Sequence, residues 1–205
     1  MHIRELPTPA LTIDLEILER NLDRMAGYCR EHRVGLRPHI KTHKTPEVAR
    51  MQLARGAVGL TVAKVGEAEV MAEAGLDNIL IAYPVFGTEN LRRLAALART
   101  RIILVALDDE ATAQELSRAA QAQRATVGVL VEFDAGFHRC GLEPGPACVE
   151  LAHKVRGSPG LEFRGLMTYY GQVWGAEDER RQEVRRVAER IGQALAAFAA
   201  AGMAV

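Results

Sequence analysis

The 205-residue sequence has few aromatic residues and few cysteines. Aromatic residues make up 5% of the chain, and the only cysteines are Cys29, Cys140 and Cys148. No two of them form a Cys-x-x-Cys pair, so we interpret them as ordinary thiols. An odd number of scattered cysteines is typical of a reducing compartment, which predicts a cytoplasmic protein.

An excess of charge and long apolar runs are also missing. The chain has 26 basic and 26 acidic residues. A balanced charge without a basic stripe argues against nucleic acid as the main partner. The longest apolar stretches are interrupted by Arg, Glu or Gly before they reach membrane-spanning length. The segment from Met1 to Pro7 shows no signal-peptide pattern. We therefore expect neither a nucleic-acid nor a membrane partner.

The chain does contain a regular alternation of two kinds of segment. Short apolar runs rich in Val and Ile predict strands, and amphipathic segments between them predict helices. The predicted strands are Ala10 to Asp14, Gly35 to Ile40, Val58 to Ala63, Asn78 to Pro84, Arg101 to Asp108, Thr126 to Asp134 and Leu161 to Tyr170. Strands that alternate with helices of this length favour parallel βα units.

The helix boundaries carry their own signals. A helix is predicted from Leu15 to Glu31, with Asp14 as its N-cap, and a longer helix from Glu177 to Ala201. Pro46 opens another helix. Glycines follow predicted helix ends at positions 56, 75 and 202.

The strand count favours an incomplete barrel. After the first strand and helix come six strand–helix units, and Gly35 to Ile40 is the first barrel strand. Ala204 and Val205 look like the opening of a further strand. A closed TIM-type (β/α) barrel needs eight strands, so residues 1–205 are interpreted as the N-terminal part of one. A doubly wound open sheet is the alternative.

One strand ends in a dense group of basic residues, Arg37, His39 and Lys41. Residues two apart in a strand share a face, which in a barrel points into the active site. Crowding by like charge should lower the pKa of Lys41, and a free amine is what Schiff-base formation requires. From spacing alone, a solvated loop explains the same residues. His39 and His43 could bind a metal, but no third ligand lies nearby in the sequence.

This segment carries a family resemblance. Arg37-Pro38-His39-x-Lys41-Thr42-His43-Lys44 resembles the cofactor-lysine motif of the D-threonine aldolase and D-serine dehydratase family. These are pyridoxal 5′-phosphate (PLP) enzymes of the alanine-racemase fold type, fold type III. The resemblance continues along the chain through Thr8-Pro9-Ala10, Gly66-Glu67-Ala68-Glu69, Ile79-Leu80-Ile81-Ala82-Tyr83-Pro84, Glu132-Phe133-Asp134-x-Gly136-x-x-Arg139-Cys140-Gly141 and Gly165-Leu166-Met167-Thr168-Tyr169-Tyr170-Gly171.

The resemblance implies roles for four residues. Lys41 would carry PLP as a Schiff base, with His39 of the same motif beside the cofactor. Arg139 would lie next to the phenolic oxygen of PLP and stabilise its anionic form. Tyr169 falls where the family places an aromatic ring or a histidine against the PLP ring.

Other residues read more simply as structural. Asp134 is expected to orient its loop or to pair with Arg139. Tyr170 stands where the aldolases often have His, so the sequence departs from the family pattern there, and we interpret it as packing. Lys44 and Lys64 each end or follow a predicted strand and could mimic a Schiff-base lysine, but Lys64 precedes a helix start and is expected to face solvent or a partner subunit.

The resemblance implies a PLP-dependent lyase that cleaves D-3-hydroxy amino acids, giving glycine and an aldehyde from D-threonine. D-serine dehydratase is the alternative, and a racemase or a non-catalytic PLP carrier ranks below it. The small-molecule substrate is a D-amino acid, and the full-length protein is expected to form a homodimer.

Several parts of such an enzyme are expected to lie outside residues 1–205. In (β/α) barrels the phosphate site comes from the loops after strands seven and eight. The family also has a C-terminal β domain with a divalent-metal site, so no metal ligand is expected in this chain. The 205 residues alone are therefore expected to be inactive or nearly so.

Overall fold

The computed structural model describes residues 3–205, so Met1 and His2, part of the stretch inspected for a signal peptide, lie outside it. Within this part the chain forms an α/β fold with five strands. The strands are β1 (Leu60–Val62), β2 (Ile79–Ile81), β3 (Ile103–Leu107), β4 (Val127–Glu132) and β5 (Leu161–Met167). The helices are α1 (Leu15–Glu31), α2 (Pro46–Ala54), α3 (Val65–Glu73), α4 (Thr88–Leu97), α5 (Glu110–Gln123), α6 (Pro146–Arg156) and α7 (Glu177–Ala200), with short 3-10 turns η1 (Ile3–Glu5) and η2 (Ile40–Thr42).

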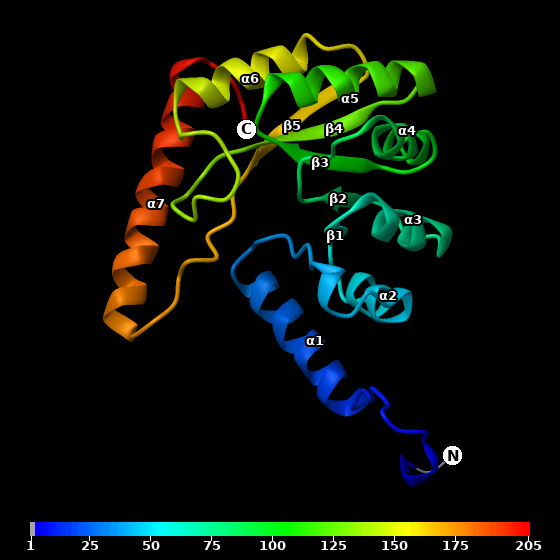
Figure 1. Ribbon diagram of the computed structural model, residues 1–205. Coiled ribbons are helices and arrows are strands. Elements are labelled where there is room, and N and C mark those ends of the chain that lie inside the picture. Colours follow the sequence, from blue (N-terminus) through cyan, green and yellow to red (C-terminus); the bar gives the residue numbers. More distant parts are fainter. Residues whose placement is uncertain (1–2) are drawn as a thin grey trace.

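The five strands form one parallel sheet in the sequential order β1-β2-β3-β4-β5. Right-handed crossovers in a constant direction place all the connecting helices on one face of the sheet. Figure 1 shows α2 to α6 following one another in chain order along that side. A doubly wound sheet would reverse its strand order at a switch point. The barrel-type arrangement predicted from the sequence is therefore confirmed, in partial form.

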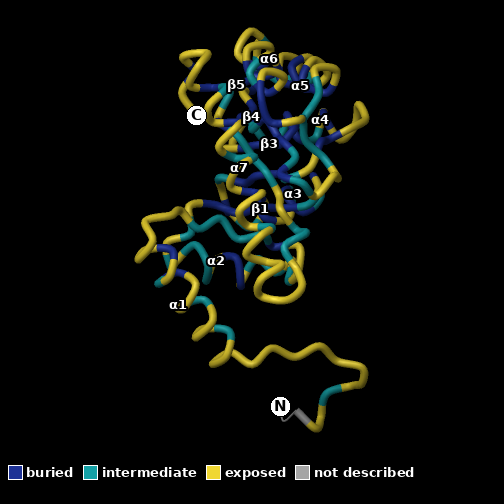
Figure 2. The backbone as a smooth tube through the Cα atoms, turned by 90° about the vertical axis from the view of Figure 1, so that its left-hand side faces the viewer, coloured by how far each residue is buried: buried dark blue, intermediate teal, exposed yellow. Residues whose placement is uncertain are grey.

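Strand alternation separates a core face from an inner face. In β4, Val127, Val129 and Val131 are fully buried against the helices. Leu130 and Glu132 alternate with them and point to the opposite face, the interior of the partial barrel. The buried residues, drawn in dark blue in Figure 2, follow the sheet and the helices that cover it.

The segment Gly35–Ile40 differs from the prediction, because it is not a full strand. It is extended and lies beside β1, but its pairing is one isolated parallel bridge between His39 and Thr61. The carbonyl oxygens of Leu36 and Pro38 accept hydrogen bonds from Val58 and Thr61, each at 2.8 Å. Pro38 has no N–H to donate, and the chain turns into η2 at Ile40, so the ladder cannot extend. The sequence predicted six barrel strands and the structure has five, because the segment Gly35–Ile40 does not form one.

Two further predicted strands are also wrong. Ala10 to Asp14 forms no strand and lies exposed in the arm that leads away from α1 (Figure 2), where Leu11 is 98% exposed. Ala204 and Val205 are likewise outside any strand. An extended run becomes a strand only when a neighbouring strand pairs with its backbone groups, and no strand within residues 3–205 pairs with Ala10 to Asp14.

The helix boundaries agree closely with the sequence signals. The helix α1 has the predicted bounds, and the Asp14 carboxylate caps it by accepting a hydrogen bond from the Ile17 N–H at 3.0 Å. The helix α7 ends one residue earlier than predicted. The glycines at positions 56, 75 and 202 adopt positive φ where helices end. None of the helices in residues 3–205 combines the length and the apolar character needed to cross a bilayer.

Candidate active site

Lys41 is presented by the short turn η2, which is held between two histidines. Ile40 is fully buried and anchors the turn. The Nδ1 atom of His39 accepts a hydrogen bond from the Lys41 N–H at 3.2 Å, and Nδ1 of His43 accepts one from the Thr45 N–H at 3.0 Å. The backbone on both sides of Lys41 is therefore fixed, while its side chain is exposed.

Lys41, Arg139 and Tyr169 meet around one aromatic ring. The Nζ atom of Lys41 lies 6.0 Å from the centroid of the Tyr169 ring, and the Cζ atom of Arg139 lies 4.6 Å from the same centroid. Phe137 packs edge-on against Tyr169 with ring centroids 5.3 Å apart, and the Arg139 guanidinium also lies 5.4 Å from the Phe137 ring. Two cations and two aromatic rings thus form a single cluster.

The three residues follow the carboxyl ends of separate extended segments, and in a parallel sheet these ends lie along the same edge. Lys41 follows the extended segment beside β1, Arg139 follows β4, and Tyr169 follows β5. The carboxyl ends of barrel strands are where active sites form in this architecture. Neither Lys41 nor Arg139 has a carboxylate within ion-pair distance among the residues that the structure describes. The sequence-predicted site residues therefore converge, and their charges remain available to a ligand.

His39 also lies in this region, in a supporting position. Its ring is half-buried, and its hydrogen bond fixes the Lys41 backbone. Burial lowers the pKa of His39 below its ordinary value, and the charge of Lys41 lowers it further against an opposing effect of Glu67. A neutral ring can accept the Lys41 N–H bond at Nδ1, which a protonated ring could not.

Arg37 does not crowd Lys41, in contrast to the prediction. Its guanidinium donates to the Asn78 backbone oxygen at 2.6 Å and to the Asn78 side-chain oxygen at 2.9 Å. Asn78 directly precedes β2, so Arg37 points to the amino ends of the strands, away from the turn of Lys41. Burial lowers the pKa of Arg37 below its ordinary value, and the positive charge of Arg164 lowers it further. Arg37 and Lys41 therefore lie on the same segment, but their side chains lie at opposite ends of the barrel strands.

The two other lysines have separate environments. Lys44 forms an ion pair with Glu67 at 3.1 Å, and Glu67 also accepts a hydrogen bond from the Ala63 N–H at 2.8 Å. Lys64 precedes α3 and is exposed, as predicted. Neither belongs to the cluster around Tyr169, which leaves Lys41 as the lysine of the site.

The loop that carries Arg139 is ordered from within by Asp134. Its Oδ1 atom accepts hydrogen bonds from the Gly136 N–H at 2.8 Å and from the His138 N–H at 3.0 Å, and its Oδ2 atom lies 2.7 Å from Nδ1 of His138. Burial opposes the charge of Asp134, but these hydrogen bonds lower its pKa below the ordinary value. Asp134 orients the loop, which was one of its two predicted roles, and it forms no ion pair with Arg139.

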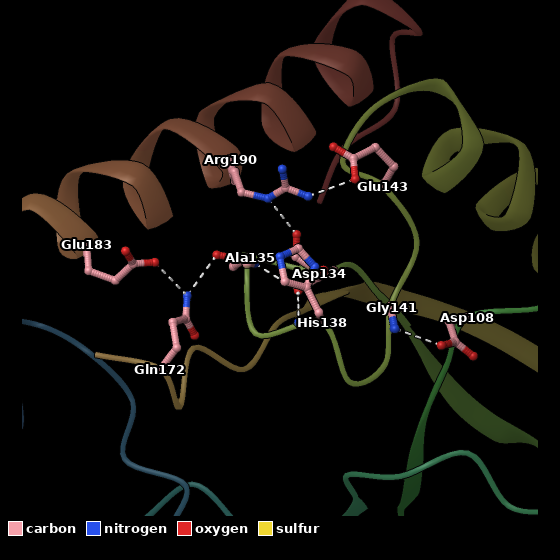
Figure 3. A network of polar contacts seen from close by, with 10 residues as sticks. Asp108, Asp134, Ala135, His138, Gly141, Glu143, Gln172, Glu183 and Arg190 are labelled. Carbon is pink, nitrogen blue, oxygen red and sulfur yellow. Dashed lines mark hydrogen bonds and ion pairs between the residues drawn. The ribbon is translucent and has the colours of Figure 1, made fainter. Parts of the chain in front are cut away.

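The same loop is held from outside by α7 and by the segment after β5 (Figure 3). Arg190 of α7 donates to the Asp134 backbone oxygen at 2.9 Å and to the Glu143 carboxylate at 2.8 Å. Gln172 donates to the Ala135 backbone oxygen at 3.1 Å and to Glu183 at 3.2 Å. These contacts fix the position of the segment that supplies both Phe137 and Arg139.

Two acidic residues near the cluster were missed by the sequence interpretation. Glu132 ends β4, faces the barrel interior and is only 2% exposed. Burial, together with the negative charge of Asp108, raises its pKa to about 7. The available signal was the carboxylate on the inward-facing position at the carboxyl end of a strand. Asp108 follows β3 in the same way and accepts a hydrogen bond from the Gly141 N–H at 2.7 Å.

The remaining polar and aromatic residues lie at the rim. Tyr170 is 52% exposed and Trp174 is 78% exposed. The cysteines are free thiols, and Cys140 is half-buried beside Arg139. No group of three or more His, Cys, Asp or Glu side chains in residues 3–205 is arranged to hold a metal ion.

Comparison with known proteins gives consistent matches along the chain. The family model described as alanine racemase, N-terminal domain, matches residues 13–205. The chain is 40% identical to a D-threonine aldolase of Arthrobacter sp. over 195 residues, which are 95% of this chain and 52% of that protein. It is 34% identical to a 3-hydroxy-D-aspartate aldolase of Paracoccus denitrificans over 98% of this chain and 53% of that protein.

A solved structure extends this similarity to three dimensions. The structure of D-threonine aldolase from Filomicrobium marinum superposes with a TM-score of 0.95 at 42% identity, covering 98% of this chain and 55% of that one. The chain therefore spans about half the length of the relatives that it matches.

Proposed function

Since the chain belongs to the alanine racemase N-terminal domain family, we propose that it forms the cofactor-binding part of a PLP-dependent lyase. The proposed substrates are D-3-hydroxy amino acids such as D-threonine, which would be cleaved to glycine and an aldehyde. The aldolase relatives support this substrate class. The observation that carries the proposal is the meeting of Lys41 and Arg139 at the ring of Tyr169.

The residues of the cluster fit the chemical groups of PLP. An exposed amine suits the aldehyde of PLP, a guanidinium suits its phenolic oxygen, and a half-exposed aromatic ring suits its pyridine ring. Lys41, Arg139 and Tyr169 supply these three groups within one cluster. Bound PLP draws electrons from the α-carbon of an amino acid, which is chemistry that no side chain supplies.

Each residue then has a defined task. Lys41 holds the cofactor through Nζ, which must be unprotonated to react, and the same amine can hold a proton once it is released. Arg139 places a fixed positive charge beside the phenolic oxygen. Tyr169 would pack against the pyridine ring of PLP, and His39 holds the backbone of Lys41 through its hydrogen bond.

The divalent metal implied by the family resemblance does not fit the residues described here. They contain no group of three or more His, Cys, Asp or Glu side chains placed for a metal ion. We therefore assign no step to a metal through this chain.

The test replaces Lys41 and compares it with a neighbouring lysine. In the full-length protein that contains this chain, Lys41→Ala is expected to abolish the visible absorbance of bound PLP and the formation of glycine from D-threonine. Lys64→Ala is the matched control and should retain both. Borohydride reduction followed by peptide mapping should place the pyridoxyl label on Lys41. A label on Lys44 or Lys64 would overturn the assignment of the lysine.

The products distinguish the activity itself. An aldolase forms glycine and acetaldehyde from D-threonine in equal amounts. A dehydratase instead releases ammonia and a 2-oxo acid from the same substrate, with no glycine. Ammonia without glycine would overturn the aldolase assignment and favour the dehydratase.

A further inference from the structure

His138 has a backbone conformation that residues other than glycine seldom adopt. Its φ is 55°, in the left-handed region, where histidine, asparagine and aspartate are found more often than other side chains. It stands between Phe137 and Arg139, the two residues of this loop that contact the Tyr169 ring. The conformation of residue 138 therefore decides how both of them are presented.

One carboxylate holds both the main chain and the ring of His138 (Figure 3). Oδ1 of Asp134 accepts the His138 N–H at 3.0 Å, and Oδ2 of the same group lies 2.7 Å from Nδ1 of the ring. A histidine ring donates to a carboxylate from Nδ1 whenever that nitrogen carries a proton. The His138 side chain is 79% exposed, so burial contributes little to its position. The carboxylate therefore fixes both the backbone and the ring of this residue.

Asp134 is a firm anchor for this contact. Its own N–H donates to the Leu142 backbone oxygen at 2.9 Å, and its backbone oxygen accepts from Nε of Arg190 at 2.9 Å. Its side chain is 13% exposed. The anchor is thus held by the far end of the loop and by α7, and it does not move with the His138 ring.

Arg139 lies between two attachments of the loop main chain. The His138 N–H is bound to Asp134 directly before it, and the Gly141 N–H donates to the Asp108 carboxylate at 2.7 Å shortly after it. The Arg139 guanidinium itself contacts aromatic rings, which hold an exposed cation only weakly. The direction of this side chain therefore depends on the main chain on either side of it.

We propose that His138 is a positioning residue for Arg139. Its ring, bound to the Asp134 carboxylate, keeps the main chain in the left-handed conformation that presents the Arg139 guanidinium to Tyr169 and so to the cofactor. This role rests on the proposed function, because the direction of Arg139 matters only where PLP is bound. The competing explanation is that the backbone conformation alone is needed and that the exposed ring is dispensable.

The experiment measures the PLP affinity of the full-length protein by visible absorbance. Glycine adopts a positive φ without strain but has no side chain, so His138→Gly removes the ring contact and keeps the backbone conformation accessible. It is expected to raise the PLP dissociation constant roughly fivefold, the effect of losing one hydrogen bond. A wild-type affinity in His138→Gly would overturn the proposal, because the left-handed backbone would then suffice without the ring.

Rescue by asparagine tests whether the ring acts as a hydrogen-bond donor. Asparagine tolerates the left-handed region, and its amide nitrogen is bonded to Cγ as Nδ1 of histidine is. His138→Asn can therefore donate to Asp134 and should bind PLP within about twofold of the wild type. If it binds no better than His138→Gly, the contact with Asp134 is not the cause and the proposal fails.

Arg124→Gly is the control for glycine at a left-handed position. Arg124 has a φ of 51° at the end of α5 and precedes β4, whereas the loop of Arg139 follows that strand. This variant should bind PLP like the wild type. A loss equal to that of His138→Gly would show a general effect of glycine and would contradict the positioning role.

A double-mutant cycle tests whether His138 acts through Arg139. With Arg139→Gln already present, His138→Gly should cause no further loss of PLP affinity, because there is no guanidinium left to position. A purely structural role for His138 would instead give additive losses, and that result would count against the proposal.

A measurement without the cofactor checks the loop directly. Amide hydrogen exchange at positions 136 and 138, whose N–H groups bind Asp134, should be faster in His138→Gly than in the wild type and slow again in His138→Asn. Exchange that is the same in all three proteins overturns the proposal. Absence of Lys41-dependent absorbance from the wild type would instead overturn the proposed function, since hydrogen exchange in the loop does not depend on PLP.

Discussion

Arg190 of α7 donates from Nε to the backbone oxygen of Asp134 at 2.9 Å, across 56 residues of sequence. Its other end pairs with Glu143 at 2.8 Å, and its side chain is 24% exposed. A single guanidinium thus joins the helix after β5 to both ends of the Arg139 loop. Arg190 therefore gives the middle of α7 a structural role, as Glu183 of the same helix does through its contact with Gln172.

In the full-length protein, Arg190→Gln should loosen this loop and weaken PLP binding several-fold. A neutral amide cannot reach both partners with the fork geometry of a guanidinium. The free energy of unfolding should fall by about 1 kcal/mol, the size of a hydrogen bond to a half-buried group. Arg181→Gln is the matched control, because Arg181 pairs with Glu177 on the exposed face of the same helix. Equal effects of the two substitutions on PLP affinity would refute the role of the Arg190 contacts in PLP binding.

Gly141→Ala should disrupt the Arg139 loop more severely. Gly141 has a φ of 104°, and a Cβ atom there would lie 2.4 Å from the Phe133 carbonyl carbon and 2.5 Å from the Asp134 nitrogen. Both are backbone atoms and cannot move aside as a flexible side chain could. We expect a loss of stability of roughly 1–3 kcal/mol, measured by denaturant unfolding, and a loss of PLP affinity. Gly192→Ala on α7, where a Cβ meets nothing within 4 Å, should leave PLP affinity unchanged.

The free energy of unfolding should depend on pH through Glu132. In the folded protein its pKa is raised to about 7 from the ordinary 4.5. Between these values the folded state holds a proton that the unfolded state has lost, so this group's contribution to stability falls as pH rises. Glu132→Gln removes that dependence and should gain on the wild type by about 2–3 kcal/mol between pH 4.5 and 7. Denaturant unfolding at several pH values measures the difference, and a constant difference would contradict the assignment.

Glu67 should show the opposite dependence. Burial alone would raise its pKa, but the hydrogen bond from the Ala63 N–H and the interaction with Lys44 lower it below the ordinary value. Its contribution to stability is therefore present above pH 4.5 and is lost as pH falls below it. Glu67→Gln should cost about 1–2 kcal/mol at neutral pH, against little for the exposed Glu47→Gln. A loss that persists unchanged at low pH would show that packing, not charge, sets the effect.

Local signals in the sequence predicted much of the fold. Asp14 could be recognised as an N-cap because a short carboxylate before an amphipathic run has one common use. The first barrel segment was overestimated because its apolar pattern was given more weight than Pro38, which lacks the N–H that a strand ladder needs. Its partner, β1, decides how many bonds can form.

The site was predictable in part for a related reason. Lys41, Arg139 and Tyr169 follow strand ends, and the topology of parallel strands brings strand ends together. Arg37 was misplaced because two-residue alternation gives the face of a residue but not the end of the strand to which a long side chain reaches. Glu132 was missed because its burial depends on β3 and on the loop folded over it, neither of which is visible in the local sequence.

The sequential sheet leaves β5 with one unpaired edge within residues 3–205. A row of free backbone N–H and C=O groups can template pairing with another extended chain. The 205 residues produced alone should therefore self-associate as their concentration rises, which light scattering would detect. Any segment that pairs with Leu161–Met167 would act as a solubility element before it contributed anything to catalysis.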